Sequence, residues 1–166
     1  MAMDRRQMLG AGGLALAAVS IGAGRLLAGD ARAEETFPYR LSDAEWRRRL
    51  GPDAYAVLRR EATEPPGSSP LLKEHRPGTF TCRGCALPLF SSRTKYNSGT
   101  GWPSFWRPLP DAVGTRGDRS LGYARTEVHC RRCGGHLGHL FDDGPRPTGK
   151  RYCMNGLALA FVPGKA

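Results

Sequence analysis

A short stretch near the C-terminus combines three residue types that could together perform thiol chemistry: Arg151, Cys153 and Asn155. Side chains alternate between the two faces of a β-strand, so these three are expected to project from the same face. A nearby cation favours the thiolate, which is the nucleophilic form of cysteine. The neutral amide can hydrogen-bond a polar substrate oxygen. The stretch therefore predicts a nucleophilic cysteine, with a buried structural cysteine as the alternative.

The other four of the five cysteines form two Cys-x-x-Cys pairs, each with glycine in or beside it. Four thiolates can bind one zinc ion tetrahedrally and leave no coordination position for a substrate. Two disulfides or redox-active dithiols are the alternatives. The odd cysteine count is then explained by one metal site plus one unpaired thiol. We expect one structural zinc ion per chain, bound by Cys82, Cys85, Cys130 and Cys133.

The first 33 residues have the features of an export signal. Arg5-Arg6 precede a weakly apolar run rich in glycine and alanine, and Ala31-Arg32-Ala33 supplies a small-x-small cleavage site before Glu34. The arginine pair resembles a twin-arginine signal, which exports folded proteins. A permanent anchor is the alternative, although the run is a poor match to a lipid span. We expect a cleaved signal over residues 1–33 and a periplasmic location.

The remaining residues, 34–166, are expected to form a single zinc-containing domain, because this length suffices for one core. Folding around zinc before export would protect the thiols from wrong disulfides in an oxidising compartment. Lys and Arg outnumber Asp and Glu by 25 to 15. The basic residues are scattered and lack the interleaved aromatic residues of a nucleic-acid platform, so we expect a solvated surface and no nucleic-acid binding.

Two short helices are expected at the start of this domain. Ser42 and Glu45 form a capping box, which predicts a helix over 43–50 that ends at Gly51. Pro52 then opens a second helix that extends to Ala62.

Strands and turns are expected beyond the helices, since 22 glycines and 13 prolines favour short elements. The loop over 98–105 contains two glycines and a proline around Trp102, and it is expected to hold that indole rigidly at a surface. The predicted strands cover residues 79–81, 123–129 and 151–162, and residues 87–90 are expected to lead the chain out of the first cysteine pair.

Three motifs, together with the cysteine pairs, resemble the methionine sulfoxide reductase B family. They are Ser-Gly-Thr-Gly-Trp-Pro-Ser-Phe at 98–105, Gly-His-Leu-Gly-His-Leu-Phe at 135–141 and Arg-Tyr-Cys-Met-Asn at 151–155, and the resemblance extends from Leu41 to Val162. The resemblance implies a mainly β fold of two antiparallel sheets, in a barrel-like or tent-like arrangement, flanked by short N-terminal helices. It also implies reduction of the R epimer of methionine sulfoxide in oxidised proteins.

The chemistry of that reaction agrees with the residues present. A sulfoxide sulfur becomes electrophilic when its oxygen accepts a proton during attack, so the site needs a thiolate, an acid and a methyl-binding wall. Cys153 is expected to attack, with Arg151 favouring its ionised form. Either His136 or His139 can deliver the proton near neutral pH; zinc ligation or core packing is their alternative.

Two further residues complete the expected site. Asn155 is expected to hold the sulfoxide oxygen, and Trp102 to contact the S-methyl group, because sulfur and methyl groups both pack well on aromatic rings. A non-catalytic zinc module and a thiol peroxidase are rival hypotheses. Neither explains the combination of Trp102, the histidines and Cys153.

Thr100 departs from the family pattern. Many members have cysteine there, which forms a disulfide with the oxidised nucleophile, whereas this chain has threonine and no sixth cysteine. We therefore expect an external reductant, either a thioredoxin-like protein or a small thiol, to regenerate Cys153. We also expect a monomer.

Overall fold

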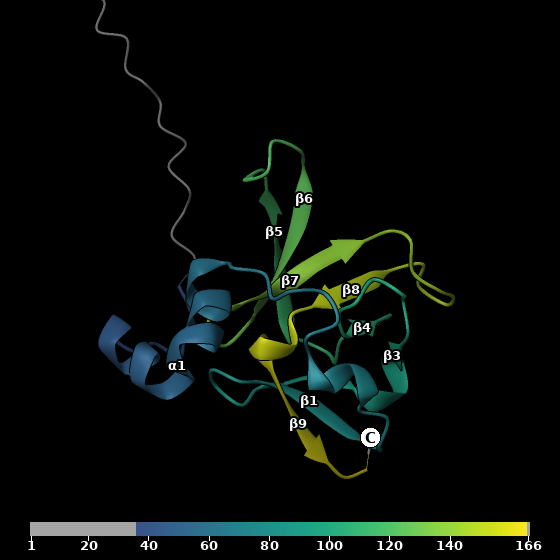
Figure 1. Cartoon of the computed structure of the whole chain (residues 1–166), viewed down its shortest axis with the longest axis horizontal. Helices are drawn as coiled ribbons and strands as arrows, with labels where there is room; N and C mark the ends of the chain where they lie inside the picture. Colours follow the sequence, from purple (N-terminus) through teal and green to yellow (C-terminus); the bar gives the residue numbers. More distant parts are fainter. Residues whose placement is uncertain (1–35, 166) are drawn as a thin grey trace, which may run out of the picture. The chain divides into compact units, whose positions relative to one another are not determined.

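Two antiparallel β-sheets and one bent helix make up residues 36–165, the part of the chain that the computed structural model describes (Figure 1). The mainly β fold class predicted from the sequence is confirmed. The predicted export signal over residues 1–33 lies outside the described residues. Within the described part, no helix has the length and apolar character needed to cross a membrane.

The helix α1 (Asp43–Arg60) contains both predicted helices. Its capping box is present, with the Ser42 hydroxyl accepting from the Glu45 N–H and the Glu45 carboxylate accepting from the Ser42 N–H. Gly51 has φ 70° and ψ 175°, so it bends the chain between the two halves, where a residue with a side chain would be strained. The helix ends at Arg60, two residues earlier than predicted. Its buried face consists of Trp46, Leu50, Ala54, Tyr55, Val57 and Leu58.

The smaller sheet has the strand order β2-β1-β9. It contains β1 (Gly78–Cys82), β2 (Pro88–Ser91) and β9 (Leu159–Pro163), so the strand predicted at 79–81 is confirmed. The larger sheet has the order β3-β4-β8-β7-β6-β5, which puts β8 between β4 and β7. Its strands are β3 (Lys95–Tyr96), β4 (Ser104–Phe105), β5 (Val113–Asp118), β6 (Arg125–Cys130), β7 (His136–Phe141) and β8 (Arg151–Met154). Three short 3-10 helices cover Pro70–Lys73, Ser92–Thr94 and Gly156–Ala158.

The prediction of one strand over 151–162 is wrong. The 3-10 helix Gly156–Ala158 divides it into β8 and β9, which belong to different sheets. The buried carboxylate of Glu64 accepts the backbone N–H groups of Gly156 and Leu157 at 2.5 and 3.0 Å. Those two donors therefore cannot continue a β ladder, and the chain crosses from one sheet to the other.

Two other boundaries differ from the prediction. The irregular segment 98–105 ends in a short strand, because Ser104 and Phe105 pair with both β3 and β8. The strand predicted to begin at Tyr123 begins at Arg125. The edge strand β5 was not predicted, since glycine and polar residues follow Val113 and give no apolar pattern.

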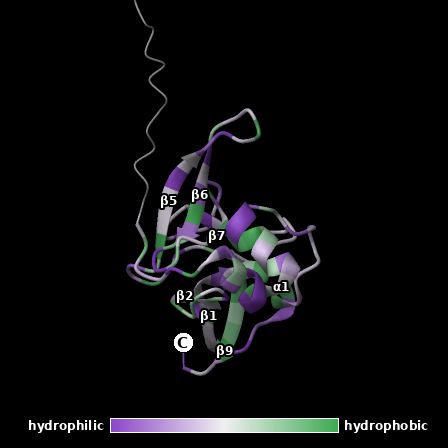
Figure 2. Ribbon diagram, turned by 90° about the vertical axis from the view of Figure 1, so that its left-hand side faces the viewer, coloured by the Kyte–Doolittle hydropathy of each residue, from purple (hydrophilic) through white to green (hydrophobic). Residues whose placement is uncertain are grey.

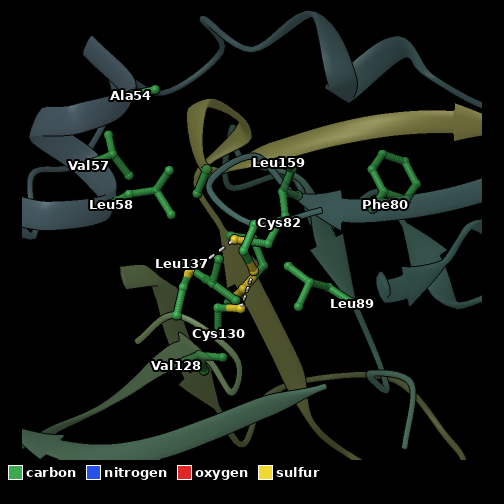
Figure 3. Close-up of a cluster of buried hydrophobic side chains, with 14 of the residues drawn as sticks. Ala54, Val57, Leu58, Phe80, Cys82, Leu89, Val128, Cys130, Leu137 and Leu159 are labelled. Atoms are coloured by element: carbon green, nitrogen blue, oxygen red, sulfur yellow. Dashed lines mark hydrogen bonds between the residues drawn. The ribbon is translucent and has the colours of Figure 1, made fainter. Parts of the chain in front are cut away.

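The core lies between the sheets and α1. Phe80, Phe90 and Phe105 are fully buried, and Phe105 contacts both other rings with centroid distances of 5.0 and 4.3 Å. Figure 3 shows Val57 and Leu58 of α1 facing Leu137 of β7. The strand β9, at the edge of the smaller sheet, is more hydrophobic than β5, at the edge of the larger one (Figure 2). This packing fixes the two sheets against each other and so places the ends of β7 and β8.

Candidate functional site

The two Cys-x-x-Cys pairs meet in one buried cluster. Cys82 and Cys133 have sulfur atoms 3.7 Å apart, Cys85 and Cys130 have theirs 3.5 Å apart, and all four lie within 4.8 Å of one another (Figure 3). A disulfide requires a distance of about 2.05 Å, so the four thiols are free. Four sulfurs around one zinc, with Zn–S about 2.3 Å, would be separated by about 3.8 Å. The donor set therefore fits one tetrahedrally bound metal ion.

Matching turns present these four thiols. The Ala86 N–H donates to the Cys82 carbonyl, and the Gly134 N–H donates to the Cys130 carbonyl, both at 2.8 Å. Ala86 and Gly134 have φ of 59° and 66°, which closes each turn behind the second cysteine. Gly134 also has no room for a Cβ, which would lie 2.3 Å from the Phe37 ring. The cluster links β1 of one sheet to β6 of the other.

The remaining cysteine lines a separate cavity of about 140 Å³. This small volume suits the end of one side chain rather than a large ligand. A larger hollow of about 660 Å³ beside α1 contains no cysteine or histidine in its lining. The structure thus brings together the predicted residues Trp102, His139, Cys153 and Asn155, and it adds four that were not predicted. The lining comprises Thr63, Trp102, Arg125, Gly138, His139, Phe141, Cys153 and Asn155.

The central position of β8 places Cys153 between two strands. In the register of the sheet it lies opposite His139 of β7 on one side and Ser104 of β4 on the other. A Cβ on Gly138 would lie 2.1 Å from the Cys153 carbonyl oxygen, so glycine is needed for β7 to approach β8 closely. The glycine between the two histidines is the feature of the sequence that indicates this close approach.

Thr100 lies beside the nucleophile candidate. Its Oγ1 is 3.7 Å from Cys153 Sγ. Ser98 Oγ is 2.8 Å from Thr100 Oγ1 and 2.7 Å from Ser104 Oγ, so three hydroxyl groups form a chain that ends at the thiol. A hydroxyl occupies the place from which a second thiol could reach Cys153.

A single buried residue, Glu64, holds both Trp102 and Asn155. The Trp102 Nε1–H donates to the Glu64 carbonyl at 3.0 Å, and the Glu64 N–H donates to Asn155 Oδ1 at 3.0 Å. Asn155 Nδ2 also donates to the Leu137 carbonyl at 3.2 Å. The partners of Glu64, including those of its carboxylate, lie 38 to 93 residues away along the chain. No local pattern in the sequence identifies it.

The two histidines differ in position. His139 is half-buried, lines the cavity and places Nε2 2.8 Å from Asp118 Oδ2. His136 is buried, is absent from the lining and places Nδ1 2.8 Å from Glu127 Oε1. Burial lowers the pKa of His139 from its ordinary value, and the Asp118 carboxylate opposes that shift. The metal-binding cluster found among the described residues consists of cysteines and includes neither histidine.

Arg151 is not among the residues that line the cavity. Its Nε and one terminal nitrogen donate to the two Asp143 carboxylate oxygens at 2.7 and 2.8 Å, and its guanidinium lies 4.2 Å from the centre of the Phe141 ring. The Asp143 hydrogen bonds raise the pKa of Arg151, and the negative charge of a Cys153 thiolate acts in the same direction. Arg151 thus contributes charge near the thiol while it supports Phe141, a lining residue.

Known proteins match the sequence of this chain over most of its length. Residues 50–163 match the SelR domain. A peptide methionine sulfoxide reductase MsrB of Leptospira interrogans is 50% identical over 121 residues, covering 72% of this chain and 92% of that protein. MsrB proteins of Leifsonia xyli and Bradyrhizobium diazoefficiens are 53% and 52% identical, over 74% of this chain and 89% and 88% of theirs. The chain therefore belongs to the SelR-domain family of methionine sulfoxide reductases B.

Proposed function

We propose that this protein reduces the R epimer of methionine sulfoxide in oxidised proteins to methionine. The observation that carries the proposal is the cavity in which Cys153, His139, Trp102 and Asn155 meet. The cavity holds a thiol, an imidazole, an indole and an amide, which are the groups that sulfoxide reduction needs. Membership of the MsrB family supports the same activity.

The first half of the reaction oxidises Cys153. Its thiolate attacks the sulfoxide sulfur, the sulfoxide oxygen takes a proton, and the oxygen is transferred to Sγ while methionine leaves. Cys153 loses two electrons and becomes a sulfenic acid, and the substrate gains them. His139 donates the proton, because it faces the cavity, and the Asn155 amide orients the oxygen through its remaining N–H. Trp102 packs against the S-methyl group.

The second half regenerates the thiol. Thr100 occupies the position beside Cys153 Sγ, and the other four cysteines are buried in their cluster, so an internal disulfide has no partner. An external thiol condenses with the sulfenic acid, releasing water and forming a mixed disulfide. A second thiol then releases Cys153 and leaves as the disulfide of the reductant. A thioredoxin-like protein or a small thiol can perform this step.

We infer that zinc is the ion bound by Cys82, Cys85, Cys130 and Cys133. Four thiolates in a tetrahedral arrangement favour zinc, and the closed ligand set makes the site structural. Such an ion contributes free energy of folding. The reacting cavity does not include the cluster, so the cysteines hold the two sheets together while Cys153 reacts.

Incubating the purified protein with each epimer of a blocked methionine sulfoxide tests this function. With dithiothreitol, we expect the R epimer to be consumed over many turnovers and the S epimer to remain. Without reductant, one turnover should leave a sulfenic acid that dimedone traps at Cys153, as read by mass spectrometry. Consumption of hydrogen peroxide but of neither epimer would indicate a thiol peroxidase. An intramolecular disulfide between Cys153 and a cluster cysteine would contradict the recycling scheme.

We propose further that residues 1–33 are a twin-arginine export signal cleaved before Glu34. The arginine pair, the weakly apolar run and the small-x-small site support this proposal. Replacing Arg5 and Arg6 with lysine should leave the precursor in the cytoplasm, since that export route reads the arginine pair. Cell fractionation and immunoblotting measure the result. Unchanged export of the double variant would rule out the twin-arginine route.

A further inference from the structure

The β5–β6 hairpin carries two oppositely charged pairs on one face. Arg116 lies opposite Glu127, and Asp118 lies opposite Arg125, in the register of the two strands. Residues two apart in a strand share a face, so the four side chains form a ladder of alternating charge. Both pairs are ion-paired: Arg116 with Glu127, and Arg125 Nη2 with Asp118 Oδ2 at 2.6 Å. Each carboxylate also contacts one histidine of β7.

The two histidine–carboxylate pairs differ in what remains available for proton transfer. His136 uses Nδ1 for Glu127, and its Nε2 is enclosed with no hydrogen-bond partner among the described residues. His139 contacts Asp118 through Nε2, and its Nδ1 has no hydrogen-bond partner among the described residues. Only the second ring lines the cavity with Cys153. His139 is therefore the histidine placed to act on a substrate.

Several contacts keep Asp118 ionised and oriented. The Ser120 N–H donates to Oδ1 at 2.8 Å, while Arg125 and His139 both contact Oδ2. These hydrogen bonds, first the one from the Ser120 backbone, hold the pKa of Asp118 well below its usual range. An ionised carboxylate only accepts hydrogen bonds, so His139 Nε2 must carry a hydrogen. Nδ1 is then the nitrogen that gains and releases the proton.

We propose that Asp118 and Arg125 are positioning residues for His139: the carboxylate fixes the ring orientation and directs the transferable proton to Nδ1, and the guanidinium fixes the carboxylate. This inference rests on the proposed function, because it assumes that His139 is the acid of sulfoxide reduction. It extends that function to a hairpin at the edge of the larger sheet (Figure 1). Arg125 also lines the cavity, so one of the two positioning residues is itself part of the site.

The two positioning residues have opposite effects on the charge of His139. Five titratable or charged groups from the strands around it matter: Asp118 of β5, Glu127 and Arg125 of β6, His136 of β7 and Cys153 of β8. Burial lowers the pKa of His139, the Asp118 hydrogen bond raises it, and the Arg125 charge lowers it. An imidazolium acid is lost as the pH rises through its pKa. Removing the charge of Asp118 should therefore move the fall in activity to lower pH, and removing that of Arg125 should move it to higher pH.

The test compares the pH profiles of kcat/KM for the R epimer in wild type, Asp118→Asn and Arg125→Gln, with Glu127→Gln as the matched control. We expect Asp118→Asn to lower kcat/KM at pH 8 by at least about tenfold, a fraction of the 10²–10⁴-fold that general acid catalysis supplies. Its alkaline limb should shift to lower pH, and that of Arg125→Gln to higher pH. Glu127→Gln removes a carboxylate that lies opposite His139 in the register but is hydrogen-bonded to His136, so its alkaline limb should shift less than that of Asp118→Asn.

Nitrogen NMR of the wild-type imidazoles tests the same inference independently. It requires no activity assay, and it does not depend on the folding of a variant. Neutral His139 should be protonated at Nε2, and protonation at Nδ1 would overturn the proposal. The proposal would also be overturned if Asp118→Asn lowered kcat/KM equally at every pH and left the alkaline limb in place. His139→Gln distinguishes this failure from that of the proposed function: if this variant keeps the wild-type alkaline limb and rate, His139 is not the acid, whatever Asp118 does.

Discussion

Cys153→Ser is expected to lower the rate of methionine sulfoxide reduction by at least about 10³-fold, because the nucleophile itself is removed. A serine hydroxyl is far less acidic than a thiol and cannot take the oxygen as a sulfenic acid. The Cys153 side chain is half-buried at the cavity, and a serine side chain is only slightly smaller than that of cysteine. The sheet should therefore accept the substitution. Turnover of the R epimer with dithiothreitol measures the effect.

Metal content and thermal unfolding provide the control for this variant. Both should equal the wild-type values, because Cys153 lies in the cavity and outside the four-cysteine cluster. Dimedone labelling after exposure to substrate should disappear at the same time. Substantial turnover by a correctly folded Cys153→Ser protein would refute its assignment as the nucleophile.

Cys82→Ser is expected to have the largest effect on stability. Loss of one ligand leaves three buried thiols around an incomplete site, and structural zinc supplies on the order of 10 kcal/mol of apparent folding free energy in small peptides. The cluster joins β1 to β6, so the link between the sheets should weaken. The contact between the Phe80 and Phe105 rings involves no cluster cysteine, so this part of the core should retain some structure. Elemental analysis and thermal unfolding, with and without a chelator, measure the change.

The wild-type protein should contain one zinc per chain, and the Cys82→Ser protein much less. Cys153→Ser is the matched comparison, since it also removes one thiol but leaves the cluster intact. The two variants should therefore separate stability from chemistry. A metal-free wild-type protein that is equally stable to heating would exclude the structural metal site.

Features set by neighbouring residues could be predicted from the sequence alone. The capping box of Ser42 and Glu45 and the bend at Gly51 depend on contacts within one or two helical turns, and both are present. The Cys-x-x-Cys pairs were recognisable because each pair is a local turn with its own ligands. The presence of Cys153, the two histidines and Trp102 in known motifs then indicated the chemistry. Their roles remain predictions for the experiments above.

Tertiary structure decided how those residues are combined. Glu64 holds Asn155 and interrupts the strand predicted over 151–162 through hydrogen bonds that span 91 to 93 residues, which no local periodicity encodes. The choice between His136 and His139 depends on a register shift between β6 and β7 and on carboxylates from two other strands. Residue types and short spacings are properties of the chain, whereas pairing across strands, burial and access to a cavity arise only once distant segments pack together.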